Sequence, residues 1–414
     1  MDAEIIAIGS ELLTPFRQDT NSLYLTDKLN QLGVEVAFKD VVGDNLQHLT
    51  QVVQTALGRA DIIILMGGLG PTEDDLTREA VSATLDVPLQ RDPQQLEVLK
   101  QRFAKRGLPM SDNNLKQADV IPGATVLPNR NGSAPGQWIA GSYDGRDKII
   151  MLLPGPPHEL QALFEEQCLE RLRTKLPEQF IAARVLKVAM IGESQCDARI
   201  APIYAKYPLV QTTILANAGE IQIHLRSRAD SSQAAQERVD RLAEELEEEL
   251  DDAIFSTQGE SLEQIVGYYL QMRSATLAVA ESCTGGLIGE RLTSVSGSSR
   301  YFAGGALVYS NEMKTKLADV PKKLIQEHGA VSAEVAKALA EGIRKRCGAT
   351  WGLAVTGIAG PGGGTPEKPV GLVYHAVSSG EKSDVVERRF VGDRERVRRW
   401  ASQQALDLLR RKLM

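Results

Sequence analysis

Cysteine is scarce in this sequence of 414 residues, and the few that occur are far apart. No two of them form a C-x-x-C pair, whereas disulfide-stapled scaffolds and zinc cages both need closely spaced cysteines. Neither a disulfide framework nor a structural zinc site is therefore expected, and a reducing compartment fits. The four cysteines are Cys168, Cys196, Cys283 and Cys347.

Long apolar runs and an excess of basic residues are missing as well. No segment reaches the roughly 18 apolar residues of a membrane span, and no basic stretch precedes an apolar run at the start. We therefore expect a cytoplasmic protein with no membrane partner. Lys and Arg total 47 against 54 Asp and Glu, a net charge of −7. This balance disfavours a nucleic-acid surface, which needs clustered basic residues, so an anionic ligand must meet a local site.

The chain is longer than one hydrophobic core usually supports, so two or three domains are expected. Short apolar runs alternate with helical patterns at both ends, which predicts an α/β domain at each end, and the strands of the first are expected to pair in parallel. A smaller α/β unit lies between them, and its last helix carries an apolar stripe on one face. The predicted domains are residues 1–172, 177–256 and 260–414.

Three motifs follow predicted strands in the C-terminal domain. Glu281-Ser282-Cys283-Thr284-Gly285-Gly286 has the pattern of strand, tight loop and helix, where backbone N–H groups can meet an anion, although a plain helix cap explains it equally well. Tyr309-Ser310-Asn311 with Lys314 follows a second strand. The nine residues from Thr356 to Gly364 include five glycines, which indicates close backbone approach to a ligand more than a flexible surface loop.

Together these motifs resemble the amidohydrolase domain of the CinA family, which also occurs as the stand-alone nicotinamide-nucleotide deamidase. The resemblance covers residues 260–414 and implies hydrolysis of nicotinamide mononucleotide to nicotinate mononucleotide and ammonia, without a cofactor. It implies Ser282 as the nucleophile, Lys314 as its base, and Tyr309 as a proton relay or a support for Lys314. The turn of Thr284, Gly285 and Gly286 would bind either the oxyanion or the substrate phosphate. Further substrate contacts implied are Thr356, Gly357, Gly360 and Arg396.

A serine–lysine pair requires an uncharged amine, which burial or nearby positive charge can provide. Histidine is the usual partner of serine, but the five histidines here lie in no triad context, so we expect each to be structural or exposed. Cys283 is a rival nucleophile, because a thiol at a helix start can be acidified. The arginines after Asp393 could bind phosphate or form salt bridges on a solvated face. The histidines are His48, His158, His224, His328 and His375.

In the N-terminal domain, Gly67-Gly68-Leu69-Gly70-Pro71-Thr72 follows a strand directly, where doubly wound sheets bind ligands. With residues 9–13, 19–21 and 42–45, this loop resembles the molybdopterin-binding fold shared by molybdenum-cofactor proteins and CinA proteins, over residues 1–170. The stretch 14–17 departs from the family's usual glycine, so the loop beside the pocket can differ.

In the CinA family this fold implies metal-dependent cleavage of ADP-ribose to AMP and ribose 5-phosphate. A divalent cation held by carboxylates would neutralise the pyrophosphate and orient water, although acids also fit a simple helix start. The expected metal ligands are Asp44, Asp74 and Asp75. The expected substrate contacts are Ser10, Glu11, Asn21, Gly67, Gly68, Gly70 and Thr72.

The middle segment resembles the KH-like unit of the same family but has no Gly-x-x-Gly clamp for a nucleic-acid backbone. We interpret it as a spacer or dimerisation element, and a homodimer is the family expectation. The leading hypothesis is an enzyme of pyridine-nucleotide salvage with two activities. Two alternatives stay open: a molybdopterin-binding protein, and a competence or DNA-damage accessory protein without turnover.

Overall fold

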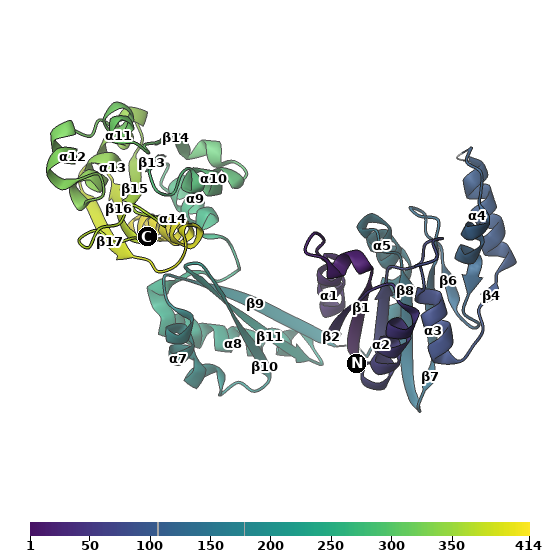
Figure 1. Cartoon of the computed structure of the whole chain (residues 1–414). Coiled ribbons are helices and arrows are strands. Elements are labelled where there is room, and N and C mark those ends of the chain that lie inside the picture. The colour runs from purple at the N-terminus through teal and green to yellow at the C-terminus, as the bar shows by residue number, and fades with distance from the viewer. Residues whose placement is uncertain (106, 178) are drawn as a thin grey trace. The chain divides into compact units, whose positions relative to one another are not determined.

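The computed structural model describes residues 1–105, 107–177 and 179–414 and contains three α/β domains (Figure 1). The chain packs into two units: residues 1–181 with 228–232, and residues 182–227 with 233–414. The middle and C-terminal domains therefore share one unit. Among the helices of the described residues, none has the length and apolar composition needed to cross a bilayer.

The N-terminal domain is built on a six-stranded sheet with strand order β2-β1-β3-β8-β7-β6. Its strands are β1 (Asp2–Ile8), β2 (Glu35–Val42), β3 (Ile62–Met66), β6 (Thr125–Leu127), β7 (Gly136–Tyr143) and β8 (Arg146–Leu153). The short strands β4 (Gln90–Arg91) and β5 (Asp119–Val120) form a separate pair. Its helices are α1 (Asn21–Gln31), α2 (Leu46–Arg59), α3 (Thr77–Leu85), α4 (Pro93–Lys105), α5 (Pro157–Leu163) and α6 (Leu169–Lys175).

The central strands of this sheet are parallel, as the alternating pattern predicts, because α1, α2 and α3 follow successive strands. The antiparallel strands β7 and β6 extend one edge, which the pattern did not predict. Every residue of β3 is buried, as expected for a strand covered on both faces. Apolar residues of α1 and α5 pack on one face, and those of α2 and α3 on the other.

The middle domain is a four-stranded sheet of order β10-β11-β9-β12 with two helices. Its elements are β9 (Phe180–Ala189), α7 (Glu193–Tyr204), β10 (Val210–Asn217), β11 (Glu220–Ala229), α8 (Ser232–Leu250) and β12 (Ile254–Ser256). The predicted apolar stripe of α8 is buried along its whole length, from Ala235 to Leu250. Its acidic run is therefore the solvated face of an amphipathic helix.

The C-terminal domain has a five-stranded sheet of order β14-β13-β15-β16-β17. Its strands are β13 (Leu277–Glu281), β14 (Phe302–Leu307), β15 (Trp351–Gly357), β16 (Leu372–Ser378) and β17 (Ser383–Arg389). Its helices are α9 (Leu262–Met272), α10 (Leu287–Ser294), α11 (Asn311–Ala318), α12 (Lys322–His328), α13 (Ala333–Cys347) and α14 (Arg394–Leu413).

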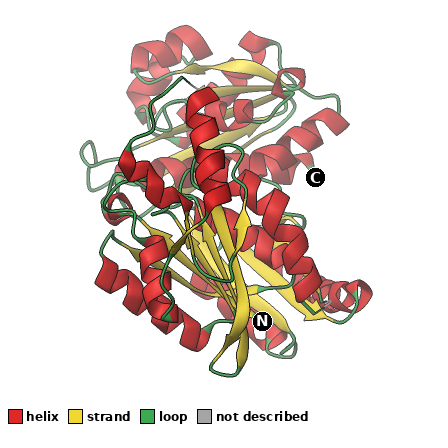
Figure 2. Ribbon diagram, turned by 90° about the vertical axis from the view of Figure 1, so that its right-hand side faces the viewer, coloured by secondary structure: helices red, strands yellow, loops and turns green. Residues whose placement is uncertain are grey.

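Strands β14, β13 and β15 are parallel, whereas β16 and β17 are antiparallel additions. Helices α9, α10 and α14 cover one face of the sheet, and α11, α12 and α13 cover the other. Figure 2 shows this layering of helices against strands. The sheets are thus mixed, with a parallel centre in both terminal domains.

Candidate functional site

Three neighbouring parallel strands bring the three C-terminal motifs to one edge of the sheet. Glu281 at the end of β13 is in register with Leu307 of β14 and with Val355 of β15. The loops after these strands therefore begin side by side, as the carboxyl ends of parallel strands do. Ser282 follows β13 at once, and its N–H donates to the carbonyl of Val355 at 3.0 Å.

The structure brings Ser282 and Lys314 together, although 32 residues separate them. The Lys314 Nζ atom lies 3.1 Å from Ser282 Oγ. It also donates to the backbone carbonyls of Val308 at 2.8 Å and Tyr309 at 3.2 Å. Only 7% of Ser282 and 2% of Lys314 is exposed. The hydroxyl and the amine therefore form a buried contact with fixed geometry.

Burial lowers the pKa of Lys314 from 10.5 to about 8, because the charged ammonium loses water. The nearest groups are two carbonyls, a hydroxyl and the thiol of Cys283, and these do not restore the stability of a cation in water. An uncharged Lys314 can donate to both carbonyls and still direct a lone pair at the Ser282 hydroxyl. The pair is thus able to transfer the serine proton near neutral pH.

Cys283, the rival nucleophile, is buried beside this pair. Burial raises the pKa of its thiol to about 12, which outweighs the charges of Lys314 and Arg394 nearby. The acidification expected from a helix start is therefore not found. Since the thiolate is the reactive form, this raised pKa disfavours Cys283 as the nucleophile.

Tyr309 contacts Lys314 through its backbone carbonyl and not through its phenol. Its hydroxyl accepts a hydrogen bond from Arg394 Nη2 at 3.0 Å, and 61% of the residue is exposed. Of the two roles left open for Tyr309, support of Lys314 has a contact in this structure. The phenol instead faces solvent at the rim of the site.

Glu281 is a site residue that the sequence motifs did not single out. Its buried carboxylate accepts from the backbone N–H groups of Gly286 at 3.0 Å, Ile288 at 3.1 Å and Gly289 at 2.8 Å. These are donors at the start of α10, which have no acceptor within the helix. Glu281 therefore fixes the turn after Ser282. Its position before the serine was visible in the sequence, but its acceptor role depends on the fold of the loop.

This arrangement bears on the predicted turn of Thr284, Gly285 and Gly286. The N–H of Gly286 is used by Glu281, and that of Gly285 donates to the carbonyl of Ser282 at 3.2 Å. A developing oxyanion or a phosphate would therefore have to use the amides that come before them. The Thr284 hydroxyl is buried and has no hydrogen-bond partner among the described residues.

The arginines at the start of α14 hold the loops around Ser282. Arg394 donates to the carbonyl of Gly360 at 2.9 Å as well as to Tyr309, and Arg398 donates twice to the carbonyl of Thr284, at 3.1 and 2.8 Å. They are four residues apart and share a helix face. Arg396 lies between them, is exposed, and packs against Gly392. The structure therefore does not place Arg396 in this network.

The second glycine-rich loop closes the opposite side. Thr356 is buried, and its hydroxyl donates to the carbonyl of Ala330 at 2.8 Å. Gly360 has a φ of 82° and is joined to Arg394 through its carbonyl. At Gly357 a side chain would meet the backbone of β16 at 2.8 Å. This loop is thus held close to the sheet.

The histidines take no part in these contacts within the described residues. His48, His158 and His328 are exposed, and His224 is half-buried. His375 is buried, pairs with the carbonyl of Ala401 at 3.1 Å, and has a pKa lowered by burial to about 4. It is an uncharged core residue.

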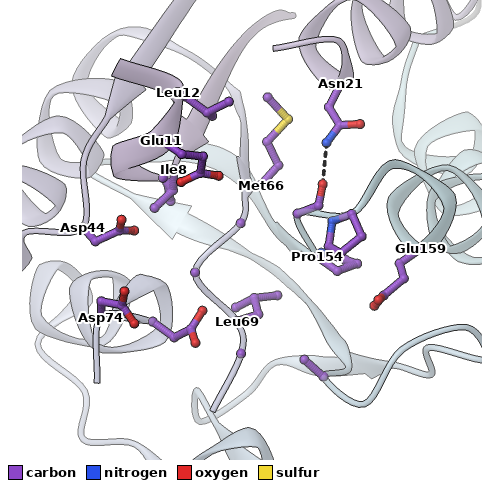
Figure 3. Close-up of a pocket in the computed structure, with 18 of the residues that line it drawn as sticks. Ile8, Glu11, Leu12, Asn21, Asp44, Met66, Leu69, Asp74, Pro154 and Glu159 are labelled. Carbon is purple, nitrogen blue, oxygen red and sulfur yellow. Dashed lines mark hydrogen bonds between the residues drawn. The ribbon is translucent and has the colours of Figure 1, made fainter. Parts of the chain in front are cut away.

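The N-terminal candidate site is a cavity of about 600 Å³ at the carboxyl edge of the first sheet (Figure 3). It is lined by every predicted residue of this domain except Ser10. Ser10 lies beside it, with its hydroxyl accepting from the N–H of Asp44 at 3.0 Å. The 154–157 turn and Glu159 also line the cavity and were not predicted as site residues.

Acidic residues outnumber basic ones in the wall of this cavity. Arg17, from the stretch that departs from the family pattern, is the one cation among its lining residues in the described chain. The lining acids are Glu11, Asp19, Asp44, Asp74, Asp75 and Glu159. Yet no three His, Cys, Asp or Glu side chains within the described ranges are grouped so that they could hold a metal ion. The carboxylates share a cavity without forming a cage.

Two of the proposed metal ligands already accept hydrogen bonds. Asp44 accepts from the N–H of Ser10 at 2.7 Å, and Asp75 accepts from the N–H of Thr72 at 2.9 Å. Each bond uses Oδ2 of its aspartate, which leaves Oδ1 for a cation. Hydrogen bonding to Thr72 lowers the pKa of Asp74, so this exposed carboxylate is ionised at neutral pH.

Asn21 is one of the residues that line the cavity (Figure 3). Its Nδ2 group donates to the carbonyl of Gly155 at 2.7 Å. Its Oδ1 atom is buried and has no partner among the described residues. An acceptor pairs with a hydroxyl or amine of a ligand and not with a phosphate oxygen. This oxygen of Asn21 is therefore suited to a hydroxyl, such as that of a sugar, and not to a phosphate.

Comparison with known proteins identifies all three domains. Residues 4–174 match the family model described as a probable molybdopterin binding domain, 183–256 the damage-inducible protein CinA KH domain, and 259–413 the CinA C-terminal domain. A CinA-like protein of Koribacter versatilis is 63% identical over 414 residues, 100% of both chains. CinA-like proteins of Solibacter usitatus and Dictyoglomus thermophilum are 51% and 40% identical and cover 100% of this chain and 98% and 100% of their own.

We expect Glu281→Ala to loosen the turn that carries Ser282, because three backbone donors lose a charged acceptor. The cost should be roughly 2–4 kcal/mol, measured as faster hydrogen exchange of the α10 amides in the full-length chain. Glu281→Gln keeps an acceptor oxygen and should cost less. Glu290→Ala, on the exposed side of α10, is the matched control. Unchanged exchange in Glu281→Ala would show that the carboxylate does not hold the turn.

Proposed function

The chain belongs to the CinA family, and we propose that its C-terminal domain hydrolyses the amide of nicotinamide mononucleotide to nicotinate mononucleotide and ammonia. The observation that carries this proposal is the buried contact between Ser282 Oγ and Lys314 Nζ at 3.1 Å. Amide hydrolysis needs a nucleophile and a base of matched pKa, and this pair provides both. No cofactor is needed for this chemistry.

In the first half-reaction, Ser282 Oγ attacks the carboxamide carbon while its proton moves to Lys314 Nζ. The resulting oxyanion needs N–H donors, and the amides of Cys283 and Thr284 are the candidates because those of Gly285 and Gly286 are engaged. The ammonium of Lys314 then protonates the leaving nitrogen. The C–N bond breaks, ammonia departs, and an ester remains on Ser282.

In the second half-reaction, water attacks this ester, and Lys314 takes the proton of the water. The tetrahedral intermediate collapses to the acid, Ser282 recovers its proton from Lys314, and the acid releases its remaining proton to solvent to give the nicotinate carboxylate. Lys314 is thus base and acid in alternation, which requires a pKa near the working pH. A value of about 8 meets this requirement.

The pH dependence of deamidation follows from that pKa. Below about pH 8 Lys314 carries a proton and cannot accept one, so kcat/KM should rise about tenfold per pH unit and level off above pH 8. Ammonia release from nicotinamide mononucleotide measures this. Lys314→Ala and Ser282→Ala should each lose at least about 100-fold, whereas Lys316→Ala, exposed on the same helix, should not. Full activity in Ser282→Ala, with loss in Cys283→Ala, would transfer the nucleophile to Cys283.

The arginines of α14 should divide into two roles. We propose Arg396, whose guanidinium is exposed, as the contact for the substrate phosphate, so Arg396→Ala should raise KM roughly tenfold with little change in kcat. Arg394 and Arg398 support the loops, so their alanine variants should lower kcat. Steady-state kinetics separates the two effects. An unchanged KM in Arg396→Ala would remove this residue from the substrate site.

For the N-terminal domain we propose metal-dependent cleavage of ADP-ribose to AMP and ribose 5-phosphate. The support is a cavity of nucleotide size that combines a glycine loop with several carboxylates. Mg²⁺ is usually held by one or two carboxylates together with substrate phosphates, so the absence of a three-ligand cluster among the described residues fits this metal. Of the candidates Asp44, Asp74 and Asp75, one or two would hold the cation together with the substrate phosphates, and the cation would supply charge neutralisation at the pyrophosphate.

Chelation should therefore abolish ADP-ribose hydrolysis, and added Mg²⁺ should restore it. Asp44→Asn and Asp74→Asn should each raise the Mg²⁺ concentration needed for half-maximal rate, whereas Glu73→Gln, outside the cavity, should not. Release of AMP is the measurement. Tight pterin binding with no hydrolysis at any metal concentration would favour the molybdopterin-binding alternative.

We also propose that the protein is a homodimer and that it acts in pyridine-nucleotide salvage.

A further inference from the structure

The loop between β3 and α3 is held tightly against the protein. Gly67 and Gly68 have φ values of 101° and 62°, which favour glycine. A Cβ atom at Gly67 would lie 2.3 Å from the carbonyl of Ile8, and one at Gly68 the same distance from the Thr77 hydroxyl. The course of this loop is therefore fixed by close contacts with the Ile8 carbonyl and the Thr77 hydroxyl and does not adapt to larger side chains.

Four successive carbonyls of this loop are bound by two residues of α3. The Thr77 hydroxyl donates to Gly67 at 2.7 Å, and its N–H donates to Gly68 at 3.2 Å. The guanidinium of Arg78 donates to Leu69 at 2.8 Å and to Gly70 at 3.0 Å. Thr77 and Arg78 are almost completely buried and do not line the cavity. These carbonyls therefore all point into the protein.

The amides must then point the other way. In a planar trans peptide the N–H of one residue is antiparallel to the carbonyl of the residue before it. The N–H groups of Gly68, Leu69 and Gly70 are therefore directed away from α3, on the side where these residues line the cavity. None of the three donates a hydrogen bond to a backbone carbonyl within the part of the chain that the structure describes. Successive free amides of this kind form an anion-binding concavity.

We propose that these three amides bind the diphosphate of a nucleotide sugar, and that Arg78 and Thr77 are positioning residues that orient them. This inference rests on the proposed hydrolysis of ADP-ribose and names the recognition element for its phosphates. Arg78 acts through the loop and not by contact, because it is buried behind it. The planar fork of arginine reaches two neighbouring carbonyls at once, which a lysine ammonium does not do with the same geometry.

The wall of the cavity carries more negative than positive charge, which affects how a diphosphate can bind. Six acids and a single arginine line it, so a bare diphosphate would be repelled by the wall. A diphosphate that carries a divalent cation meets the carboxylates through the metal and the amides through its oxygens. The loop therefore recognises the phosphate part of a metal–diphosphate complex.

The test uses the full-length chain and two measurements: calorimetric binding of inorganic pyrophosphate with Mg²⁺, and steady-state hydrolysis of ADP-ribose. Arg78→Lys and Thr77→Val should weaken pyrophosphate binding at least tenfold and raise KM by a similar factor, with a smaller change in kcat. Thr77→Ser retains the hydroxyl and should behave like the wild type. Arg91→Ala, which breaks an exposed ion pair with Asp119 in the same domain, is the control.

Circular dichroism and thermal unfolding establish which variants fold. If Arg78→Lys does not fold, the comparison of Thr77→Val with Thr77→Ser decides. Folded variants with unchanged pyrophosphate affinity and KM would overturn the positioning role. Wild-type protein that binds pyrophosphate with Mg²⁺ but does not cleave ADP-ribose would refute the proposed hydrolysis and leave the amide site standing.

Discussion

The C-terminal site depends on one contact: a lysine amine held against a serine hydroxyl in a place where the amine has lost most of its water. A lysine so deeply buried would be unfavourable as a cation, and the surrounding carbonyls accept hydrogen bonds without supplying a full negative charge. Side chains that do not touch the Lys314 amine hold the surrounding loops in place. Glu281 fixes the turn after Ser282, and Arg394 and Arg398 fix the loops above it. The unusual pKa of Lys314 follows from the burial of its amine.

In both terminal domains, the loops at the carboxyl edge of the parallel strands are oriented in the same general way. In each case, side chains that need not meet the ligand bind backbone groups of the loop. Glu281 takes up N–H groups after Ser282, whereas Arg78 and Thr77 take up carbonyls after β3. The choice of backbone group decides what the loop offers to a ligand. Glu281 occupies backbone N–H groups after Ser282, so these groups cannot bind an anion. Thr77 and Arg78 instead occupy carbonyls after β3, which leaves the N–H groups of that loop free to bind one.

The sequence predicted the α/β class, the parallel centre of the N-terminal sheet and the motifs, since hydrophobic periodicity and glycine-rich loops after strands are local signals. The juxtaposition of Ser282 with Lys314 rested on family resemblance, and the strand register provides its physical reason. The antiparallel strands β7 and β16 were not predicted as such, because pairing direction depends on tertiary packing. The roles of Glu281 and Arg78 were missed for a related reason. A side chain that binds backbone groups elsewhere in the fold produces no periodicity or motif in the sequence.

The central claim is that burial lowers the pKa of Lys314 to about 8, so that a minor but usable fraction of the amine is uncharged at neutral pH. The most direct measurement is a nuclear magnetic resonance titration of the Lys314 side chain in the full-length protein, with the signal assigned by its loss in Lys314→Arg. The account predicts a midpoint at about pH 8, where burial places the pKa of the amine. A midpoint at the ordinary value of 10.5 would contradict it, because a permanently charged lysine cannot take the proton of Ser282.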